Sequence, residues 1–156
     1  MKTLVVALAA GVIAFGAMAG PATAAQPAQD TFIVVMNADN EVPHCGPSTD
    51  AARGVAIFHV TNEATGTVAW QIVAENLPGT ISAAHIHHAN AGVAGPVVQP
   101  LPPTPGDESG VVGSGTFTNP ALLAAIRATP AAYYVNVHST VCPTGVIRGQ
   151  FGDHGP

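Results

Sequence analysis

The stretch TVAWQIVAENL, residues 67–77, decides the fold class of this chain. Its side chains Val68, Trp70, Ile72 and Ala74 lie two residues apart. Because successive side chains of an extended strand point to opposite faces, this spacing predicts a β-strand with one buried apolar face. The stretch ends in Leu-Pro-Gly, a sequence typical of a turn.

Similar short alternating runs, separated by Gly, Pro and Asn, recur on both sides of this strand. They predict further strands over residues 31–38, 55–61, 80–88, 96–101, 110–118, 131–139 and 145–151. One helix is predicted over residues 121–128, because Asn119 is a good N-cap, Pro120 suits the first helical position and Pro130 ends the segment. This pattern of about eight strands and one short connecting helix predicts an all-β domain, either an antiparallel β-sandwich or a barrel.

The first residues resemble an export signal. Lys2 precedes an almost uninterrupted apolar run over residues 3–20, and Ala22-Thr23-Ala24 matches the small-x-small pattern of a signal peptidase site. The alternative is a membrane anchor, but the run is near the lower length limit for a spanning helix. We therefore predict a signal peptide over residues 1–24, a short linker over 25–30, and a secreted or periplasmic domain over 31–152 that does not contact the membrane.

Charge and motifs narrow the function further. The formal net charge is -5, and Arg53, Arg127 and Arg148 are the only fixed cations after Lys2. These are too few for a phosphate-binding face, so nucleic acid is not an expected partner, whereas a protein or matrix partner is left open. The sequence contains no Gly-x-Ser-x-Gly motif and no phosphate loop, which argues against hydrolytic chemistry.

The two cysteines, Cys45 and Cys142, give an even count in a chain predicted to be exported. A disulfide between them is the expected state in an oxidising compartment. The alternative is a soft metal site that uses Cys45 together with His44.

Three histidines are the main candidates for a functional site. His85 and His87 are two residues apart in a predicted strand, so both project from one face, and His138 ends a later strand. We predict that the three lie on the non-core side of their strands, opposite Ala84, Ile86, Tyr133, Val135 and Val137. They would either bind a metal ion or form a hydrogen-bonded polar cluster with Asn136 and Tyr134, and we weigh these two hypotheses equally.

Four motifs together resemble the CHRD domain family, the module named after chordin. They are Asn-Glu-Val-Pro at 40–43, Ala-His-Ile-His at 84–87 with the Gly-rich residues 92–95, Tyr-Val-Asn-Val-His-Ser at 134–139, and Gly-Val-Ile-Arg-Gly-Gln-Phe at 145–151. This resemblance implies an immunoglobulin-like antiparallel β-sandwich, related in architecture to copper/zinc superoxide dismutase. It implies no particular activity, and we interpret Glu41 with Pro43 as a turn at the edge of a strand.

The likeness to the dismutases implies a ligand set. Those enzymes resemble this chain in a His-x-His on one strand and a later Val-His, which supply copper ligands and correspond here to His85, His87 and His138. Arg148 would then stand near the metal as an anion-guiding residue, or else donate hydrogen bonds to loop carbonyls. No counterpart of the dismutase zinc loop is found, so the resemblance extends to copper alone.

Three hypotheses follow for the function. The first is an exported CHRD binding or structural module that holds copper through the three histidines. The second is a copper-only enzyme similar to superoxide dismutase, which the missing zinc loop disfavours. The third is a metal-free structural or adhesive domain.

Overall fold

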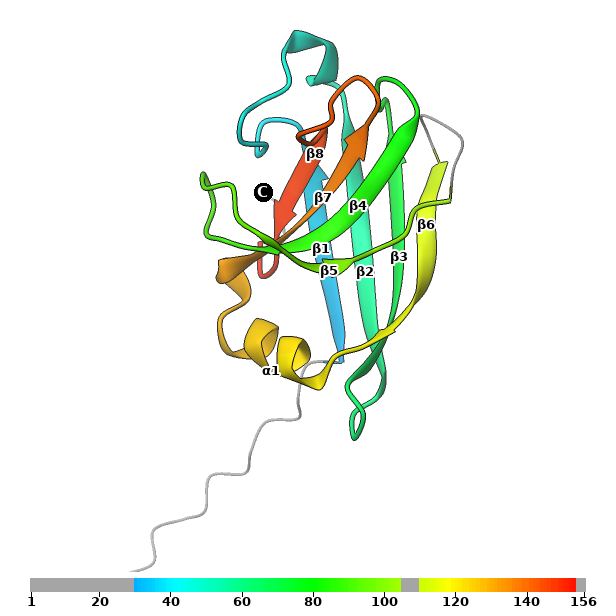
Figure 1. Cartoon of the computed structure of the whole chain (residues 1–156), viewed down its shortest axis with the longest axis vertical. Coiled ribbons are helices and arrows are strands. Elements are labelled where there is room, and N and C mark those ends of the chain that lie inside the picture. The colour runs from blue at the N-terminus through cyan, green and yellow to red at the C-terminus, as the bar shows by residue number, and fades with distance from the viewer. Residues whose placement is uncertain (1–29, 105–109, 154–156) are drawn as a thin grey trace, which may run out of the picture.

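A computed structural model describes residues 30–104 and 110–153 of the chain. Within these ranges it contains eight strands, one α-helix and two short 3₁₀ helices (Figure 1). The strands are β1 (Thr31–Asn37), β2 (Arg53–Asn62), β3 (Thr67–Glu75), β4 (Ile81–His88), β5 (Val97–Pro100), β6 (Gly110–Thr118), β7 (Tyr133–Ser139) and β8 (Ile147–Gln150). The helices are η1 (Pro47–Thr49), α1 (Pro120–Ala128) and η2 (Pro130–Ala132). Each predicted strand and the predicted helix is present.

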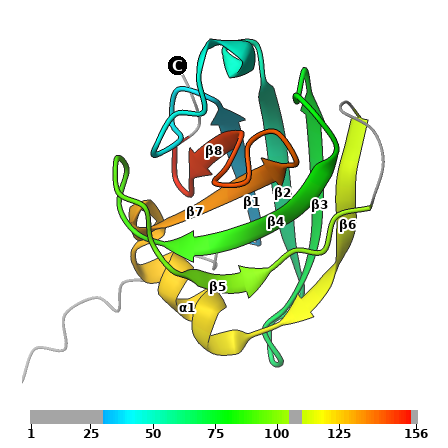
Figure 2. The same ribbon diagram turned by 45° about the horizontal axis from the view of Figure 1, so that its top comes forward.

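The eight strands form one antiparallel sheet in the order β5-β4-β7-β8-β1-β2-β3-β6. The sheet curls, so that β5, β4, β7 and β8 face the other four strands (Figure 2). At the join between the two halves, β8 and β1 share a single register pair, Asn37 with Arg148. At the open side, the backbone N–H of Thr104 donates to the carbonyl oxygen of Val112 at 2.7 Å, which brings the chain after β5 to β6. The predicted all-β antiparallel sandwich with one short helix is confirmed.

The core lies between the two halves of the sheet. Trp70 and Ile72 of β3 face inward, as the alternation of residues 67–77 predicts, and both are at most 5% exposed. Phe58 of β2 contacts Phe151 with ring centroids 5.2 Å apart. Burial of large apolar side chains of this kind supplies most of the stability of a small β-domain.

Helix α1 covers one end of this core (Figure 1). The side chain of Asn119 accepts a hydrogen bond from the backbone N–H of Leu122 at 3.1 Å, so it caps the helix as the sequence predicts. Leu122, Leu123 and Ile126 are buried and pack against the strands. Strand β7 begins two residues later than predicted, because Pro130–Ala132 form the 3₁₀ turn η2.

The side of β7 that faces away from the core carries polar side chains. The side opposite the core, which we call the polar face, comprises His85 and His87 of β4, Tyr134, Asn136 and His138 of β7, and Arg148 and Gln150 of β8. It lies on the non-core side as predicted, and it is largely covered: Asn136 is only 2% exposed, whereas His85 and His138 are half-buried.

Two loops, 38–52 and 89–96, cover the polar face beside β8 (Figure 1). The side chain of Asn40 donates to the carbonyl oxygen of Arg148 at 3.3 Å and ties down the first loop. The side chain of Gln150 donates to the carbonyl oxygen of Ala89 at 3.0 Å and ties down the second. Both faces of β7 are therefore buried, one by apolar packing and the other by loops held through polar contacts.

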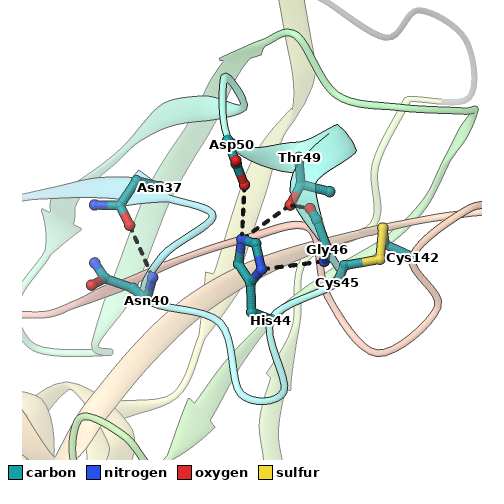
Figure 3. Close-up of polar contacts among 8 residues, drawn as sticks. All are labelled: Asn37, Asn40, His44, Cys45, Gly46, Thr49, Asp50 and Cys142. Carbon is teal, nitrogen blue, oxygen red and sulfur yellow. Dashed lines mark hydrogen bonds and ion pairs between the residues drawn. A yellow bond between two sulfur atoms is a disulfide. The ribbon is translucent and has the colours of Figure 1, made fainter.

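The predicted disulfide between Cys45 and Cys142 is confirmed (Figure 3). It joins the loop 38–52 to the turn between β7 and β8 and spans 97 residues of sequence. Closing a loop of that length stabilises the folded state by about 4–5 kcal/mol at most, through the lower entropy of the unfolded chain. Both cysteines are used in this bond, which removes the alternative of a Cys45 metal ligand.

Within the described ranges, no helix has the length and apolar character needed to cross a membrane. The predicted signal peptide over residues 1–24 lies outside the described residues.

Candidate metal centre

The register of β4 and β7 brings the three histidines together. His85 pairs with Asn136, His87 with Tyr134, and Ala83 with His138. Because residues paired across an antiparallel sheet project from the same face, His138 lies diagonally beside His85. The ring centroids are 4.9 Å apart for His85 and His138, and 5.5 Å apart for His85 and His87.

One nitrogen from each of these rings lies within 4.8 Å of the other two, a spacing that allows all three to bind one ion. The Nδ1 atom of His85 is 3.1 Å from Nε2 of His138. His87 is 7% exposed, while His85 and His138 are half-buried. The site is therefore partly shielded from water by the fold.

Backbone carbonyl groups fix the tautomers of two of these rings. Nδ1 of His87 donates to the carbonyl oxygen of Gly95 at 2.8 Å, and Nδ1 of His138 donates to that of Pro143 at 3.1 Å. A carbonyl oxygen only accepts, so in each neutral ring the hydrogen is on Nδ1 and the lone pair is on Nε2. Histidines that bind metals commonly donate their other ring N–H in this way, which orients the ring.

The surroundings of the rings keep all three uncharged at neutral pH. Burial, with the neighbouring His138 and His87, lowers the pKa of His85 to about 4. Burial also lowers the pKa of His87 and of His138, although the carbonyl contacts oppose that effect. Neutral imidazoles keep a lone pair, and this is the protonation state that metal binding requires.

Tyr134 supports the His87 ring from one side. The two rings stack with centroids 4.7 Å apart and planes 10° apart. The Tyr134 hydroxyl oxygen accepts from the backbone N–H of Gly95 at 3.1 Å, so the Gly95 peptide holds both rings. A Cβ atom at Gly95 would lie 2.2 Å from the carbonyl oxygen of His88, and only glycine fits there.

Of the two roles expected for Arg148 from the sequence, its contacts match that of a donor to loop carbonyls. Its side chain is 1% exposed and its guanidinium lies over the Tyr134 ring, 3.4 Å from the centroid. It donates to the carbonyl oxygens of Val93 and Asn90, both at 2.9 Å, and to Oε1 of Gln150. An anion arriving from solvent does not reach a guanidinium so enclosed, and the alternative prediction, a donor to loop carbonyls, describes its contacts.

Glu41 is a buried carboxylate beside the polar face that was not expected from the sequence. Its side chain is 5% exposed, and burial raises its pKa to about 7 against the opposing effects of Val42, Arg148 and Asn136. The interpretation as a turn is right for the backbone, because the N–H of Glu41 donates to the carbonyl oxygen of Ala38 at 3.0 Å. The signal available was the Asn-Glu-Val-Pro motif itself, which places a carboxylate where a turn alone does not need one.

Three buried side-chain atoms of the polar face and its cover have no hydrogen-bond partner in the described structure: Oε1 of Glu41, Nε2 of His87 and Oδ1 of Asn136. Buried polar atoms are nearly always paired, so unpaired ones need an explanation. The two oxygens are acceptors, and Nε2 of His87 is one as well in the tautomer that Gly95 selects. All three atoms are thus acceptors, which a donor or a cation would satisfy.

The remaining described histidines lie elsewhere. His88 stacks on Tyr133 on the opposite side of β4, with centroids 4.7 Å apart. His44 lies in the loop 38–52, where its ring contacts Gly46, Thr49 and Asp50 (Figure 3). His59 contacts Thr31 at the exposed start of β1.

The comparison with protein families gives one result. The model of the CHRD domain matches residues 32–151. This chain belongs to the CHRD domain family. No curated protein and no solved structure matches it significantly.

Proposed function

We propose that this protein is an exported CHRD module that binds one copper ion through His85, His87 and His138. The observation that carries the proposal is the set of three neutral imidazoles with converging nitrogens. Two of them have their lone pairs directed by backbone carbonyl groups.

The unpaired atoms favour a bound cation over a purely structural polar cluster. Without an ion, Nδ1 of His85 and Nε2 of His138 form a hydrogen bond with each other, but Nε2 of His87 is buried with no hydrogen-bond partner. An unpaired buried polar atom costs about 1–3 kcal/mol, and the polar face has three of them. A metal ion bound by Nε2 of His87 would pair that nitrogen directly. The charge of the ion would also stabilise the two unpaired oxygens.

Copper is the proposed ion because the donor set consists of imidazole nitrogens. Imidazole suits copper and zinc, whereas carboxylate and carbonyl oxygens suit magnesium and calcium. The His-x-His and Val-His arrangement that resembles the dismutase copper ligands favours copper over zinc. Copper bound here would supply a centre able to change oxidation state, and Tyr134 and Gly95 would hold its His87 ligand in place.

The binding module is preferred over the dismutase-like enzyme. A dismutase must attract an anionic substrate, and Arg148, the candidate for that task, is enclosed by loop carbonyls. Turnover by the copper-loaded protein near the diffusional limit would reverse this preference.

Export is supported by the disulfide, since such bonds persist in oxidising compartments. If the predicted signal peptide is cleaved, mass spectrometry of the exported protein will place its N-terminus at Ala25 or Gln26. Protein that retains Met1-Lys2 would contradict the proposed export route.

Titration of the exported, metal-stripped protein with Cu(II) tests the copper site. We expect one equivalent to bind, and the affinity to fall at least about a hundredfold in the variant His85→Ala/His87→Ala, which keeps one ligand. The matched control is His59→Ala, which removes an exposed histidine on β2 and should bind as wild type does. Equal saturation of wild type and the double variant would reject the site and leave the metal-free structural domain.

A further inference from the structure

Glu41 is the only buried acidic side chain among the described residues. It belongs to the loop 38–52, far in sequence from the strands that carry the histidines. Burial of a carboxylate without a full set of partners is unfavourable, so its place against the polar face needs a reason. The carboxyl of Glu41 interacts with the backbone of Val42, with the charge of Arg148 and with the side chain of Asn136.

We propose that Glu41 balances the charge of the cation held by His85, His87 and His138, and thereby makes the site prefer a divalent ion to a monovalent one. This inference rests on the proposed function, because it assumes that the histidines bind a metal ion. Glu41 is a positioning and charge-balancing residue in this proposal and not a ligand. It is not among the residues whose donor atoms lie within 4.8 Å of one another.

Asn136 connects the carboxylate to the metal site. It lies on β7 between Tyr134 and His138, directly opposite His85. Its side chain interacts with Glu41, which lowers the pKa of that carboxyl, and lies close enough to His87 to raise the pKa of that ring, although no hydrogen bond joins Oδ1 of Asn136 to Nε2 of His87. Glu41, Asn136 and His87 therefore follow one another across the polar face, and each has an unpaired atom there.

With a metal ion bound, the positive charges at the site would be stabilised by an anionic group. Three neutral imidazoles do not offset the charge of a bound ion, and Arg148 adds a positive charge on the same face. Arg148 already donates to Val93, Asn90 and Gln150, and within the described residues no ion pair joins it to Glu41. Ionised Glu41 is thus available to stabilise a cation, and its effect grows with the charge of that cation.

The turn after β7 is shaped around the carboxylate. Gly145 has a φ of +139°, and a Cβ atom there would lie 2.5 Å from the carboxylate of Glu41. Glycine at this position leaves the space that the carboxylate fills. The same turn contains Pro143, whose carbonyl oxygen orients His138, so the carboxylate and the ligand share one supporting segment.

The test compares the affinities of two ions of different charge in matched variants. Metal-stripped wild type, Glu41→Gln and Glu75→Gln are titrated with Cu(II) and with Ag(I), a monovalent ion that also binds imidazole. Glu75→Gln removes the same charge from an exposed carboxylate, which pairs with Arg53 on β2. We expect Glu41→Gln to weaken Cu(II) binding about tenfold and Ag(I) binding by a much smaller factor, and Glu75→Gln to change neither.

A second variant, Glu41→Asp, keeps the negative charge and should retain most of the selectivity for Cu(II) over Ag(I), even if Glu41→Gln folds poorly. Equal affinity in wild type and Glu41→Gln, or an equal loss for both ions, would overturn the charge-balancing role while leaving the copper site intact. Binding of Cu(II) to wild type that is unaffected by His85→Ala/His87→Ala would instead overturn the proposed function itself. Loss of the selectivity in Glu41→Asp would also count against the proposal, since the charge is retained.

Discussion

The two faces of β7 are both buried, but they are buried by different means. On the core face, Val135 and Val137 are fully enclosed by the side chains of the opposite half of the sheet. On the polar face, Tyr134 and Asn136 are covered by loops that hydrogen bonds and a disulfide hold in place. Among the described residues, the three buried side-chain atoms without a hydrogen-bond partner all belong to the polar face or its cover, and none to the core face. The same strand thus contributes stability on one side and a candidate site on the other.

Removal of the disulfide should have the largest effect and should act on the polar face. The variant Cys45→Ser/Cys142→Ser frees the turn that contains Pro143, the residue whose carbonyl oxygen orients His138. We expect a loss of about 4 kcal/mol in the free energy of unfolding, measured with urea, and weaker Cu(II) binding in the protein that remains folded. Unchanged copper affinity in the folded variant would show that the loop cover does not support the site.

A cavity in the core face should lower stability without altering the site. Ile86 is fully buried and lies between His85 and His87 in sequence, with its side chain on the opposite face. Ile86→Ala should cost about 3 kcal/mol in urea denaturation, because it removes buried methyl and methylene groups. His87→Ala, one residue away, should abolish high-affinity Cu(II) binding at a smaller cost in stability. A larger loss of stability in His87→Ala and a larger loss of Cu(II) affinity in Ile86→Ala would contradict the distinction between the two faces.

The pH dependence of stability should reveal the buried carboxylate. The pKa of Glu41 is about 7 in the folded protein, above its ordinary value of 4.5, so the folded state holds this proton more tightly than the unfolded state. The stability contributed by the protonated group is complete below about pH 4.5 and is lost as the pH rises through 7. Metal-free Glu41→Gln does not ionise and should avoid that loss.

We therefore subtract the free energy of unfolding of wild type from that of Glu41→Gln. This difference should be about 2 kcal/mol larger at pH 8 than at pH 5. The lowered pKa values of the histidines affect both proteins alike and cancel in this difference. A difference independent of pH would indicate that Glu41 is accessible to water.

The smallest expected effect concerns the support of His87. Tyr134→Phe keeps the ring that stacks on His87 but removes the hydroxyl oxygen that accepts from Gly95. We expect a loss of about 1 kcal/mol in stability and a modest loss of Cu(II) affinity. Tyr133→Phe, on the other face of β7, serves as the matched control and should leave the copper affinity unchanged.

Much of this arrangement was predictable from local sequence. Alternation identified the strands and placed His85 and His87 on one face, because side-chain direction depends only on the backbone of the strand. The disulfide followed from an even cysteine count in a chain predicted to be exported.

The cover of the polar face was not predictable in this way. It depends on contacts between distant segments, such as the bond from the Asn40 side chain to the carbonyl oxygen of Arg148. Alternation predicts that a side chain points away from the core, but it does not predict whether water or a loop covers that side chain. For this reason the sequence left two roles open for Arg148, and Glu41 was interpreted as a turn at the edge of a strand.

The most direct test of the copper site is electron paramagnetic resonance of the protein loaded with one equivalent of Cu(II), read for the number of coupled nitrogen nuclei. We predict coupling to the nitrogens of three histidine ligands in wild type, with the same spectrum in His59→Ala and a different one in His85→Ala/His87→Ala. A wild-type spectrum that is unchanged by the double substitution would contradict copper binding at His85, His87 and His138.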